Sequence, residues 1–487
     1  MMDLAGAAAA LAAVAWAVTL LALAVLALYG AHRLHLAWAA WGSRRATPAP
    51  LPPLPADAAA WPVVTVQLPL FNEPAVAARL VDAAAALDWP AGRLEVQVLD
   101  DSTDGTSALV AARVAHWRAR GVHVVHLRRT DRAGYKAGAL EAGRLCARGA
   151  LLLVLDADFV PAPDLLVRTV PHFADPTVGM VQVRWDHLNR GPGLLTELEA
   201  VLLDGHFAVE QRARASRGAV FNFNGTAGLW RAEAITSAGG WHADTLTEDL
   251  DLSYRAALAG WRFVLVDDDG VPGELPARMP AFRTQQYRWA KGSIEVARKL
   301  GRPIAASAWP WRRRLGALLH VTHNVPYLAT GALVVASAPA LALAPPPAWA
   351  RPLLVASAAL TALVLTAYVL VPARLLPSRP RLRALVRLPA LVALTCGISL
   401  GQSRAVLAGA FAPGGEFVRT PKDGVIGARK PPRTGRRHPW RAELAVAAAL
   451  LAAAALTVAR GALVEAAHLV LFAAGLLWVG VASAFDL

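Results

Sequence analysis

The sequence predicts an α/β domain inserted between apolar helices that cross a membrane. Between Trp61 and about Leu300, short β-branched runs alternate with Ala-rich helical patterns, which is typical of an α/β fold. The flanking regions are apolar: 56% of the 487 residues are hydrophobic, and the mean hydropathy is +0.40, more than one soluble domain shows. We expect four parts: a first transmembrane helix with an interfacial segment (1–45), a Pro-rich linker (46–60), the α/β domain (61–300) and a C-terminal membrane region (301–487).

The charge and cysteine content argue against several classes of protein. A net charge of +14 is compatible with binding nucleic acid, but the basic residues lie beside apolar spans, where membrane topology explains them. No nucleic-acid partner is therefore expected. The two cysteines, Cys146 and Cys396, lie far apart and outside any CxxC or Cys/His spacing, so neither a disulfide framework nor a zinc site is indicated.

The first apolar segment, residues 4–30, carries no charge and is long enough to cross a bilayer. A signal peptide is the alternative, but such a peptide has a basic start and a shorter apolar core, and here only Asp3 precedes the run. Arg33, Arg44 and Arg45 follow the segment, which predicts that the next region faces the cytoplasm.

Five strands are expected in the α/β domain, and polar residues follow three of them. Ligands of such sheets bind beyond the carboxyl ends of the strands, so these polar residues predict one shared site. They are Asn72 and Glu73, Asp100 and Asp101, and Asp156 and Asp158, and the strands are 63–68, 95–99, 122–127, 151–155 and 179–184.

Four further spans are expected near 316–340, 352–372, 442–460 and 462–483. The stretch 388–411 is ambiguous. The loop 374–387 before it holds five Lys or Arg residues and the stretch 419–437 after it holds seven, so both loops should be cytoplasmic. A segment that joins two cytoplasmic loops cannot cross once, and we therefore expect 381–410 to be interfacial or re-entrant. The sequence thus predicts five spans, with a sixth crossing as the alternative.

The acidic and basic residues near the strand ends suit a metal and a nucleotide. In an extended chain Asp156 and Asp158 project to the same side, and two carboxylates favour Mg²⁺ or Mn²⁺, although a solvated turn is the simpler explanation of this motif alone. Lys136 is expected to open a helix, where a diphosphate binds well; a surface lysine is the alternative. Asp249 precedes a helical pattern and is either a general base or a helix cap. Asp100 and Asp101 either cap a helix or reach a nucleobase, and the residues leave this choice open.

At this point the sequence resembles the processive family 2 glycosyltransferases with the GT-A fold, which include cellulose synthases and the cellulose synthase-like A mannan or glucomannan synthases. The resemblance covers roughly residues 61–440 and predicts an α/β GT-A (nucleotide-diphospho-sugar transferase) cytoplasmic domain between transmembrane helices. It rests on the ordered motifs D, DxD, TED and QxxRW, matched by Asp100 or Asp101, by 156–158, by 247–249 and by 285–289. The run 223–231 is similar to the cellulose synthase-like A pattern. The loop 412–440 contains 417–422, which is similar to the cellulose synthase gating loop, with Arg419 in place of a valine.

The resemblance implies a role for each motif residue. The nucleotide-sugar would be bound by Phe71, Glu73, Asp100 or Asp101, Lys136, Asp156, Gln285 and Arg288. Asp156 and Asp158 would hold Mg²⁺ or Mn²⁺. Asp249, with Glu248, would be catalytic. The acceptor would be bound by Trp289, Asn224, Gly225 and Thr226, and the gating loop would act through Phe417, Thr420 and Lys422.

The expected function is an inverting transfer of a hexose from GDP-mannose or UDP-glucose to a growing β-linked polysaccharide, coupled to export. A non-processive transferase that acts on a lipid or a short glycan is the alternative within enzymes. A nucleotide-driven transporter is disfavoured because no GxxxxGK[ST] motif is present, and a scaffold would leave the acidic clusters without a role. The expected location is a bacterial inner membrane, and the expected partners are the donor, the polysaccharide acceptor, the bilayer and an unidentified export subunit.

Overall fold

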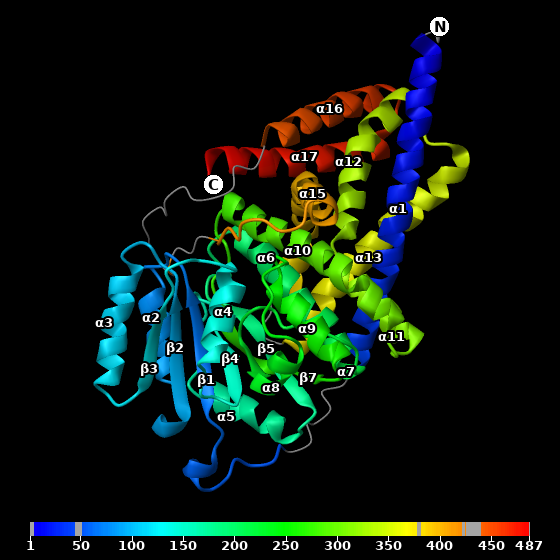
Figure 1. Ribbon diagram of the computed structural model, residues 1–487. Coiled ribbons are helices and arrows are strands. Elements are labelled where there is room, and N and C mark those ends of the chain that lie inside the picture. The colour runs from blue at the N-terminus through cyan, green and yellow to red at the C-terminus, as the bar shows by residue number, and fades with distance from the viewer. Residues whose placement is uncertain (1–3, 44–50, 377–380, 421–423, 425–439, 487) are drawn as a thin grey trace.

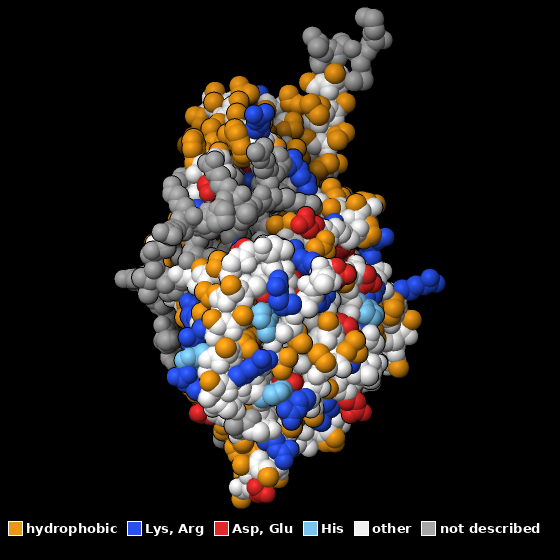
Figure 2. Space-filling view, turned by 60° about the vertical axis from the view of Figure 1, so that its left-hand side comes forward, with side chains coloured by type: hydrophobic (Ala, Val, Ile, Leu, Met, Phe, Trp, Pro, Cys, Tyr) orange, Lys and Arg blue, Asp and Glu red, His pale blue; other side chains and the backbone are white. Residues whose placement is uncertain are grey.

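The computed structural model describes residues 4–43, 51–376, 381–420, 424 and 440–486. A mixed α/β domain occupies one end of the molecule and long helices from both ends of the chain occupy the other (Figure 1). In the space-filling view, hydrophobic side chains dominate the helical end, whereas charged and polar side chains cover the α/β domain (Figure 2). This is the α/β domain between apolar helices that the sequence predicts.

The α/β domain is built on one seven-stranded sheet with the strand order β3-β2-β1-β4-β6-β5-β7. Strands β1, β2, β3 and β4 run parallel, β6 runs antiparallel to both β4 and β5, and β7 is parallel to β5. The carboxyl ends of β1, β2 and β4 therefore meet at one edge of the sheet. The strands are β1 Val64–Leu70, β2 Leu94–Asp100, β3 His123–Arg128, β4 Leu151–Val154, β5 Val178–His187, β6 Gly228–Arg231 and β7 Arg262–Gly273.

Helices cover both faces of this sheet, and its strands are therefore buried on both sides. Val66, Leu68 and Val96 pack against Leu80 and Val110 on one face. The other face packs Leu152 and Val154 against helices that carry site residues at their amino ends. The first face is covered by α2 Ala77–Ala85, α3 Thr106–Arg118 and α5 Leu165–Thr169, and the second by α4 Tyr135–Leu145, α8 Ala232–Ser237 and α9 Glu248–Leu258.

A second set of helices joins the sheet domain to the apolar helices. It comprises α6 Leu194–Gly205, the π-helix η4 His206–Gln211, α7 Arg212–Ser216, α10 Met279–Ala306 and α11 Trp311–Val321. The helix η4 packs against α1 and α13 through Ala208, Val209 and their apolar neighbours, and α10 packs against α15. The remaining short elements are η1 Ala58–Ala60, η2 Ala91–Arg93, η3 Val170–Ala174, η5 Ala348–Ala350 and α14 Arg381–Val386.

Within the described residues, six helices are long and apolar enough to cross a membrane. They are α1 Leu4–Gly42, α12 Val325–Leu343, α13 Arg351–Leu375, α15 Leu388–Phe411, α16 Trp440–Ala459 and α17 Leu463–Phe485. The sequence predicts five spans and places 381–410 at the interface. In the structure α15 is one 24-residue apolar helix whose buried face packs against α10, α12 and α17, and its length and composition also suit the sixth crossing that the sequence leaves as the alternative.

A buried ion pair fastens α10 to α16. The Arg283 guanidinium contacts the Glu443 carboxylate, and these two side chains are 3% and 0% exposed. The guanidinium also donates to the Ser483 hydroxyl on α17 at 2.8 Å. Removing one partner of such a pair leaves the other as an uncompensated buried charge.

We expect Glu443→Ala to destabilise the protein by about 3–5 kcal/mol, because Arg283 would stay buried without its partner. Thermal unfolding of the detergent-solubilised protein measures this change. Glu233→Ala, at an exposed glutamate on α8, is the matched control and should leave the unfolding temperature unchanged. Replacing both partners by apolar residues, as in Arg283→Met with Glu443→Leu, should recover most of the loss. An unfolding temperature that Glu443→Ala does not change would contradict this role of the pair.

Candidate active site

One cavity at the carboxyl edge of the sheet brings together residues from positions 69 to 420. It encloses about 1200 Å³ of empty space, part of it open to solvent. Strand ends, the amino ends of α4 and α9, one face of α10 and the 412–420 segment all contribute to its wall. The predicted site residues that line it are Phe71, Glu73, Asp101, Lys136, Asp156, Asp158, Asn224, Gly225, Glu248, Asp249, Gln285, Arg288, Trp289, Phe417 and Thr420.

The two DxD aspartates lie in a turn and not in an extended strand. Strand β4 ends at Val154, and the Phe159 N–H donates to the Asp156 carbonyl at 3.0 Å, which closes the turn. The Thr226 hydroxyl accepts from the Asp156 N–H at 2.8 Å, and the Asp158 carboxylate accepts from the Glu274 N–H at 3.2 Å. The prediction that Asp156 and Asp158 project to one side of an extended strand is therefore wrong, although both residues line the cavity.

Lys136 is the cation at the centre of the acidic residues. It lies in the first turn of α4, after Gly134, whose φ of +68° is easily adopted by glycine. Its ammonium contacts the Asp156 carboxylate at 2.6 Å, the Gly225 carbonyl at 2.9 Å and the Glu248 carboxylate at 3.6 Å. Burial lowers the pKa of Lys136, but Asp156 and Glu248 outweigh it and raise the pKa. The ammonium therefore stays charged.

Asp249 is the carboxyl group whose acidity is most altered in this cavity. Burial raises its pKa to about 7, with Glu248 adding to the effect and Lys136 opposing it. The backbone of Gly225 passes directly beside it: a Cβ at Gly225 would lie 3.2 Å from the Asp249 carboxylate and 3.3 Å from the Lys136 ammonium. A carboxylate with a pKa near neutrality is suited to accept a proton.

Helix α10 supplies three residues on one face, since Gln285, Arg288 and Trp289 are three and four positions apart. The Arg288 guanidinium donates to the Val418 carbonyl at 3.0 Å and lies over the Phe417 ring, 4.2 Å from its centroid. Phe417 in turn stacks on Tyr135, with centroids 6.4 Å apart. The gating-type segment thus forms part of the cavity wall. Lys422 lies outside the described residues.

An ion pair and a cation–π contact lie at the β1 end of the cavity. The Arg419 guanidinium is 3.6 Å from the Glu73 carboxylate. The residue that departs from the gating-loop pattern therefore contacts a residue that is predicted to bind the nucleotide. The Arg132 guanidinium lies 3.4 Å from the centroid of the Phe71 ring.

The structure separates the roles of Asp100 and Asp101. Asp100 is fully buried and accepts from the Ser102 N–H, the Ser107 hydroxyl and the His126 ring at 2.6–2.8 Å. Burial raises the pKa of Asp100, but these hydrogen bonds outweigh burial and lower it. Asp101 lines the cavity and is held by the Arg129 Nε at 2.8 Å. Asp100 therefore stabilises the start of the next helix, and Asp101 is the one of the two that a ligand can reach.

Thr226 also lies outside the cavity lining. Its side chain is fully buried and supports the DxD turn through the Asp156 N–H. The sequence predicts a contact between Thr226 and the acceptor, whereas in the structure its hydroxyl accepts from the Asp156 backbone.

Several cavity residues are missing from the sequence prediction. Asp186 and His187 lie at the carboxyl end of β5, which extends past the predicted strand, and Glu274 follows β7, which was not predicted. Arg132 and Glu199 have no motif around them. The signal that could have revealed Asp186 and His187 is their position directly after a predicted strand.

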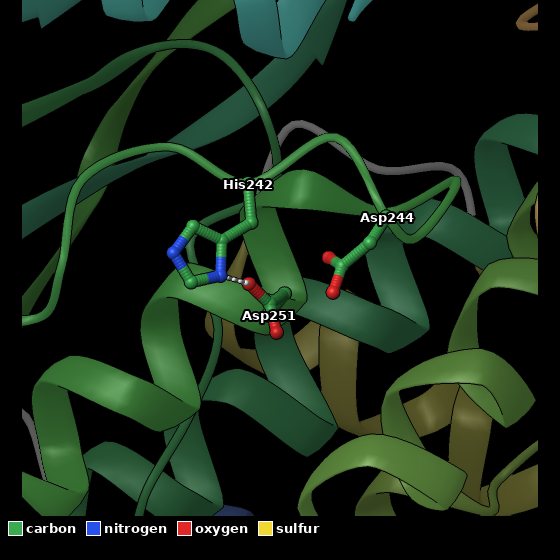
Figure 3. Close-up of side chains that lie close together, drawn as sticks. All are labelled: His242, Asp244 and Asp251. Carbon is green, nitrogen blue, oxygen red and sulfur yellow. Dashed lines mark ion pairs between the residues drawn. The ribbon is translucent and has the colours of Figure 1, made fainter.

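A separate cluster of metal-ligand types, His242, Asp244 and Asp251, lies outside the residues that line the cavity (Figure 3). Its carboxylates already have cationic partners. The Lys299 ammonium is 2.8 Å from Asp244 and 2.9 Å from Asp251, and the Arg255 guanidinium is 2.8 Å from Asp251. These contacts make the cluster an ion-pair network that fastens α10 to α9, and a divalent ion would have to displace Lys299.

The sequence and the fold both match known proteins. Residues 62–292 match the family described as "Glycosyltransferase like family 2". "Probable glucomannan 4-beta-mannosyltransferase 10" of Arabidopsis thaliana is 45% identical over 248 residues, 49% of this chain and 44% of that protein. "Probable glucomannan 4-beta-mannosyltransferase 3" of Oryza sativa subsp. japonica is 44% identical over 254 residues, 51% of this chain and 46% of that protein. The match spans about half the length of these plant relatives, which give no support for the expected bacterial membrane.

A mannosyltransferase from Pyrobaculum calidifontis, solved in complex with GDP-Man and Mn²⁺, has a similar fold. Its TM-score is 0.53 at 23% identity, and the match covers 82% of this chain and 99% of that one. At this identity the likeness concerns the fold alone. Residues 62–292 are therefore similar to family 2 glycosyltransferase domains, and the likeness to the solved structure shows a GT-A-like fold.

Proposed function

We propose that this protein is an inverting, membrane-embedded glycosyltransferase that adds mannose from GDP-mannose to the end of a β-linked polysaccharide. The observation that carries the proposal is the cavity in which Asp249, Lys136, Arg288, Asp156 and Asp158 meet. The relatives named for glucomannan mannosyl transfer favour mannose over the glucose of UDP-glucose.

The acceptor hydroxyl loses its proton to Asp249, which lies beside the Asn224-Gly225 backbone. The acceptor oxygen then bonds to the anomeric carbon as the bond from that carbon to the diphosphate breaks, and its electron pair leaves with the nucleoside diphosphate. Attack from the opposite side inverts the configuration, so an α-linked donor gives a β-linked product. Arg288 and Lys136 supply fixed positive charge for the leaving group.

A divalent ion fits the DxD turn, where it would compete with Lys136 for the Asp156 carboxylate. Asp156 and Asp158 both line the cavity, and two carboxylate ligands with substrate phosphates make the oxygen-rich set that Mg²⁺ and Mn²⁺ bind. When bound there, the ion would neutralise charge on the diphosphate. Trp289 offers a flat apolar surface for a sugar ring, and Asp101 and Glu73 are the carboxylates available to the nucleoside.

The apolar helices suggest that synthesis and export are coupled, since α10 lines the cavity and packs directly against α15. The basic residues around the spans favour a cytoplasmic catalytic domain. The alternative, transfer to a lipid or a short glycan, remains a different outcome of the same assay.

Membranes supplied with GDP-mannose and, separately, UDP-glucose test the donor. We expect radiolabel from GDP-mannose to enter a long product that endo-β-1,4-mannanase degrades. Incorporation from UDP-glucose alone would overturn the mannosyl proposal, and a product of one or two sugars on a sizing gel would overturn processive synthesis.

Replacing Asp249 by Asn should lower kcat by about 10²–10⁴-fold, because the acceptor proton would have no base. GDP-mannose binding, measured by equilibrium dialysis, should persist. Asp88→Asn, at an exposed aspartate, is the matched control.

The raised pKa of Asp249 also predicts a pH profile for the wild-type enzyme. Below pH about 7 the base becomes protonated, so kcat/KM should fall about tenfold per pH unit and should level off above pH 7. The same shift from 3.8 predicts stability that rises as the pH falls from 7 toward 4, and Asp249→Asn should abolish this rise. A flat rate profile between pH 5 and 8 would contradict Asp249 as the base.

Chelation by EDTA should stop transfer, and Mn²⁺ or Mg²⁺ should restore it. Asp158→Asn should raise the metal concentration needed for half-maximal activity at least about tenfold. Asp244→Asn, in the His242 cluster, is the matched control and should leave the metal requirement unchanged. The reverse pattern would place the functional ion at the His242 cluster.

A further inference from the structure

A partly buried polar network leads from the cavity wall at Asn224 to two of the apolar helices. The His206 ring is 2.9 Å from the Asn224 side-chain oxygen, and His206 also faces Glu210 across 4.0 Å. Glu210 is 8% exposed. Asn224 lines the cavity, whereas His206 and Glu210 lie behind it. A residue of the cavity wall is thus held by His206, which is not among the residues that line the cavity.

Backbone carbonyls fix which atoms of this network donate. The Asn222 amino group donates to the Phe223 carbonyl at 2.8 Å, so the atom of Asn224 that faces it at 3.1 Å has to be the oxygen. The His206 Nε2, which contacts the same oxygen, therefore carries a proton. Burial lowers the pKa of His206, which favours the neutral ring with this single N–H. With two donors on its oxygen, Asn224 keeps its amino group for a ligand; that group makes only a 3.4 Å contact with the Asn222 carbonyl.

The π-helix η4 makes this arrangement possible. The Gln211 amino group donates to the Asn222 carbonyl at 2.9 Å, and the Asn222 amino group contacts the Asn224 oxygen at 3.1 Å. His206 therefore contacts Asn224 directly, and Gln211 supports it through Asn222. His206 and Gln211 are five apart. In an α-helix they would point about 140° away from each other, whereas the i→i+5 bonding of a π-helix brings them to one face.

Glu210 attaches the network to the membrane region. Its carboxylate accepts from the Tyr368 hydroxyl on α13 at 2.7 Å and lies 3.8 Å from Arg33 on α1 and 3.2 Å from Arg214 on α7. Gly205 allows the Tyr368 ring to approach η4, because a Cβ at position 205 would lie 2.7 Å from that ring. Burial raises the pKa of Glu210, but Arg214 and Arg33 outweigh it and lower the pKa.

We propose that His206 is a positioning residue that orients the Asn224 amide so that its amino group donates to an oxygen of the acceptor sugar, and that Glu210 anchors η4, the helix that carries His206, to α1 and α13. The inference rests on the proposed function for the identity of the acceptor. It adds that the acceptor site is held in shape by membrane helices that lie outside the cavity.

Mannotetraose binding and transfer test the proposal in the purified full-length protein. Tryptophan fluorescence gives the mannotetraose Kd, and initial rates give the acceptor and donor KM. His206→Ala should weaken mannotetraose binding and raise the acceptor KM about tenfold, with the donor KM unchanged. His206→Gln should restore binding to within about threefold, because its amide N–H replaces the Nε2 donor. His116→Ala, at a half-buried histidine on α3 that does not line the cavity, is the matched control.

The double variant separates positioning from a general packing effect. If His206 acts through Asn224, His206→Ala added to Asn224→Ala should cause no further loss of affinity. Additive losses, or His206→Gln behaving like His206→Ala, would overturn the proposal. Absence of wild-type mannotetraose binding would overturn it as well.

Binding that follows this pattern without any mannosyl transfer would support the network and would refute the proposed function alone. Tyr368→Phe tests the link to the membrane helices, because it removes the hydroxyl on Glu210 and keeps the ring. We expect the mannotetraose Kd to rise about threefold, and an unchanged Kd would overturn that link.

Discussion

The accumulation of carboxylates around one ammonium group is the constraint on which this site depends. Asp156, Glu248 and Asp249 lie close to Lys136, in a cavity where charge is poorly screened. Neighbouring negative charges make it harder for each carboxyl group to ionise, and the positive charge of Lys136 offsets part of this effect. The balance is uneven: Lys136 contacts Asp156 and Glu248 directly, and Asp249 is the one whose pKa is raised. Lys136 thus pairs directly with two of the carboxylates, and Asp249 is the one suited to accept a proton.

The same cavity depends on both halves of the chain. The sheet contributes its strand ends, while α10 contributes Gln285, Arg288 and Trp289 and is fixed to α16 by Arg283 and Glu443. The 412–420 segment closes another side through Phe417. Geometry at the site is thus set by contacts from both the sheet domain and the apolar helices.

Much of this arrangement could be predicted from the sequence, because strand ends and motif order are local signals. The α/β class, the five predicted strands and the helix start at Lys136 are all present. Strand β6 was missed because its four residues, Gly228–Arg231, are held by pairing with β4 and β5 and not by any period of their own. Strand β7 was missed because Asp267, Asp268, Asp269 and Gly270 have the composition of a turn. The roles of Thr226 and Asp100 depend on tertiary hydrogen bonds that spacing does not reveal.

Because α10 and the 412–420 segment form part of the cavity wall, the site cannot be prepared intact as a short soluble fragment. A water-soluble fragment cut at the end of the sheet domain would retain the DxD turn and Lys136 but would lose Phe417, Arg419 and Thr420 from the wall. It would also expose the face of α10 that packs against Ala405 and Val406. The apolar helices are therefore part of what holds the cavity in shape, and the smallest fragment with an intact cavity includes them.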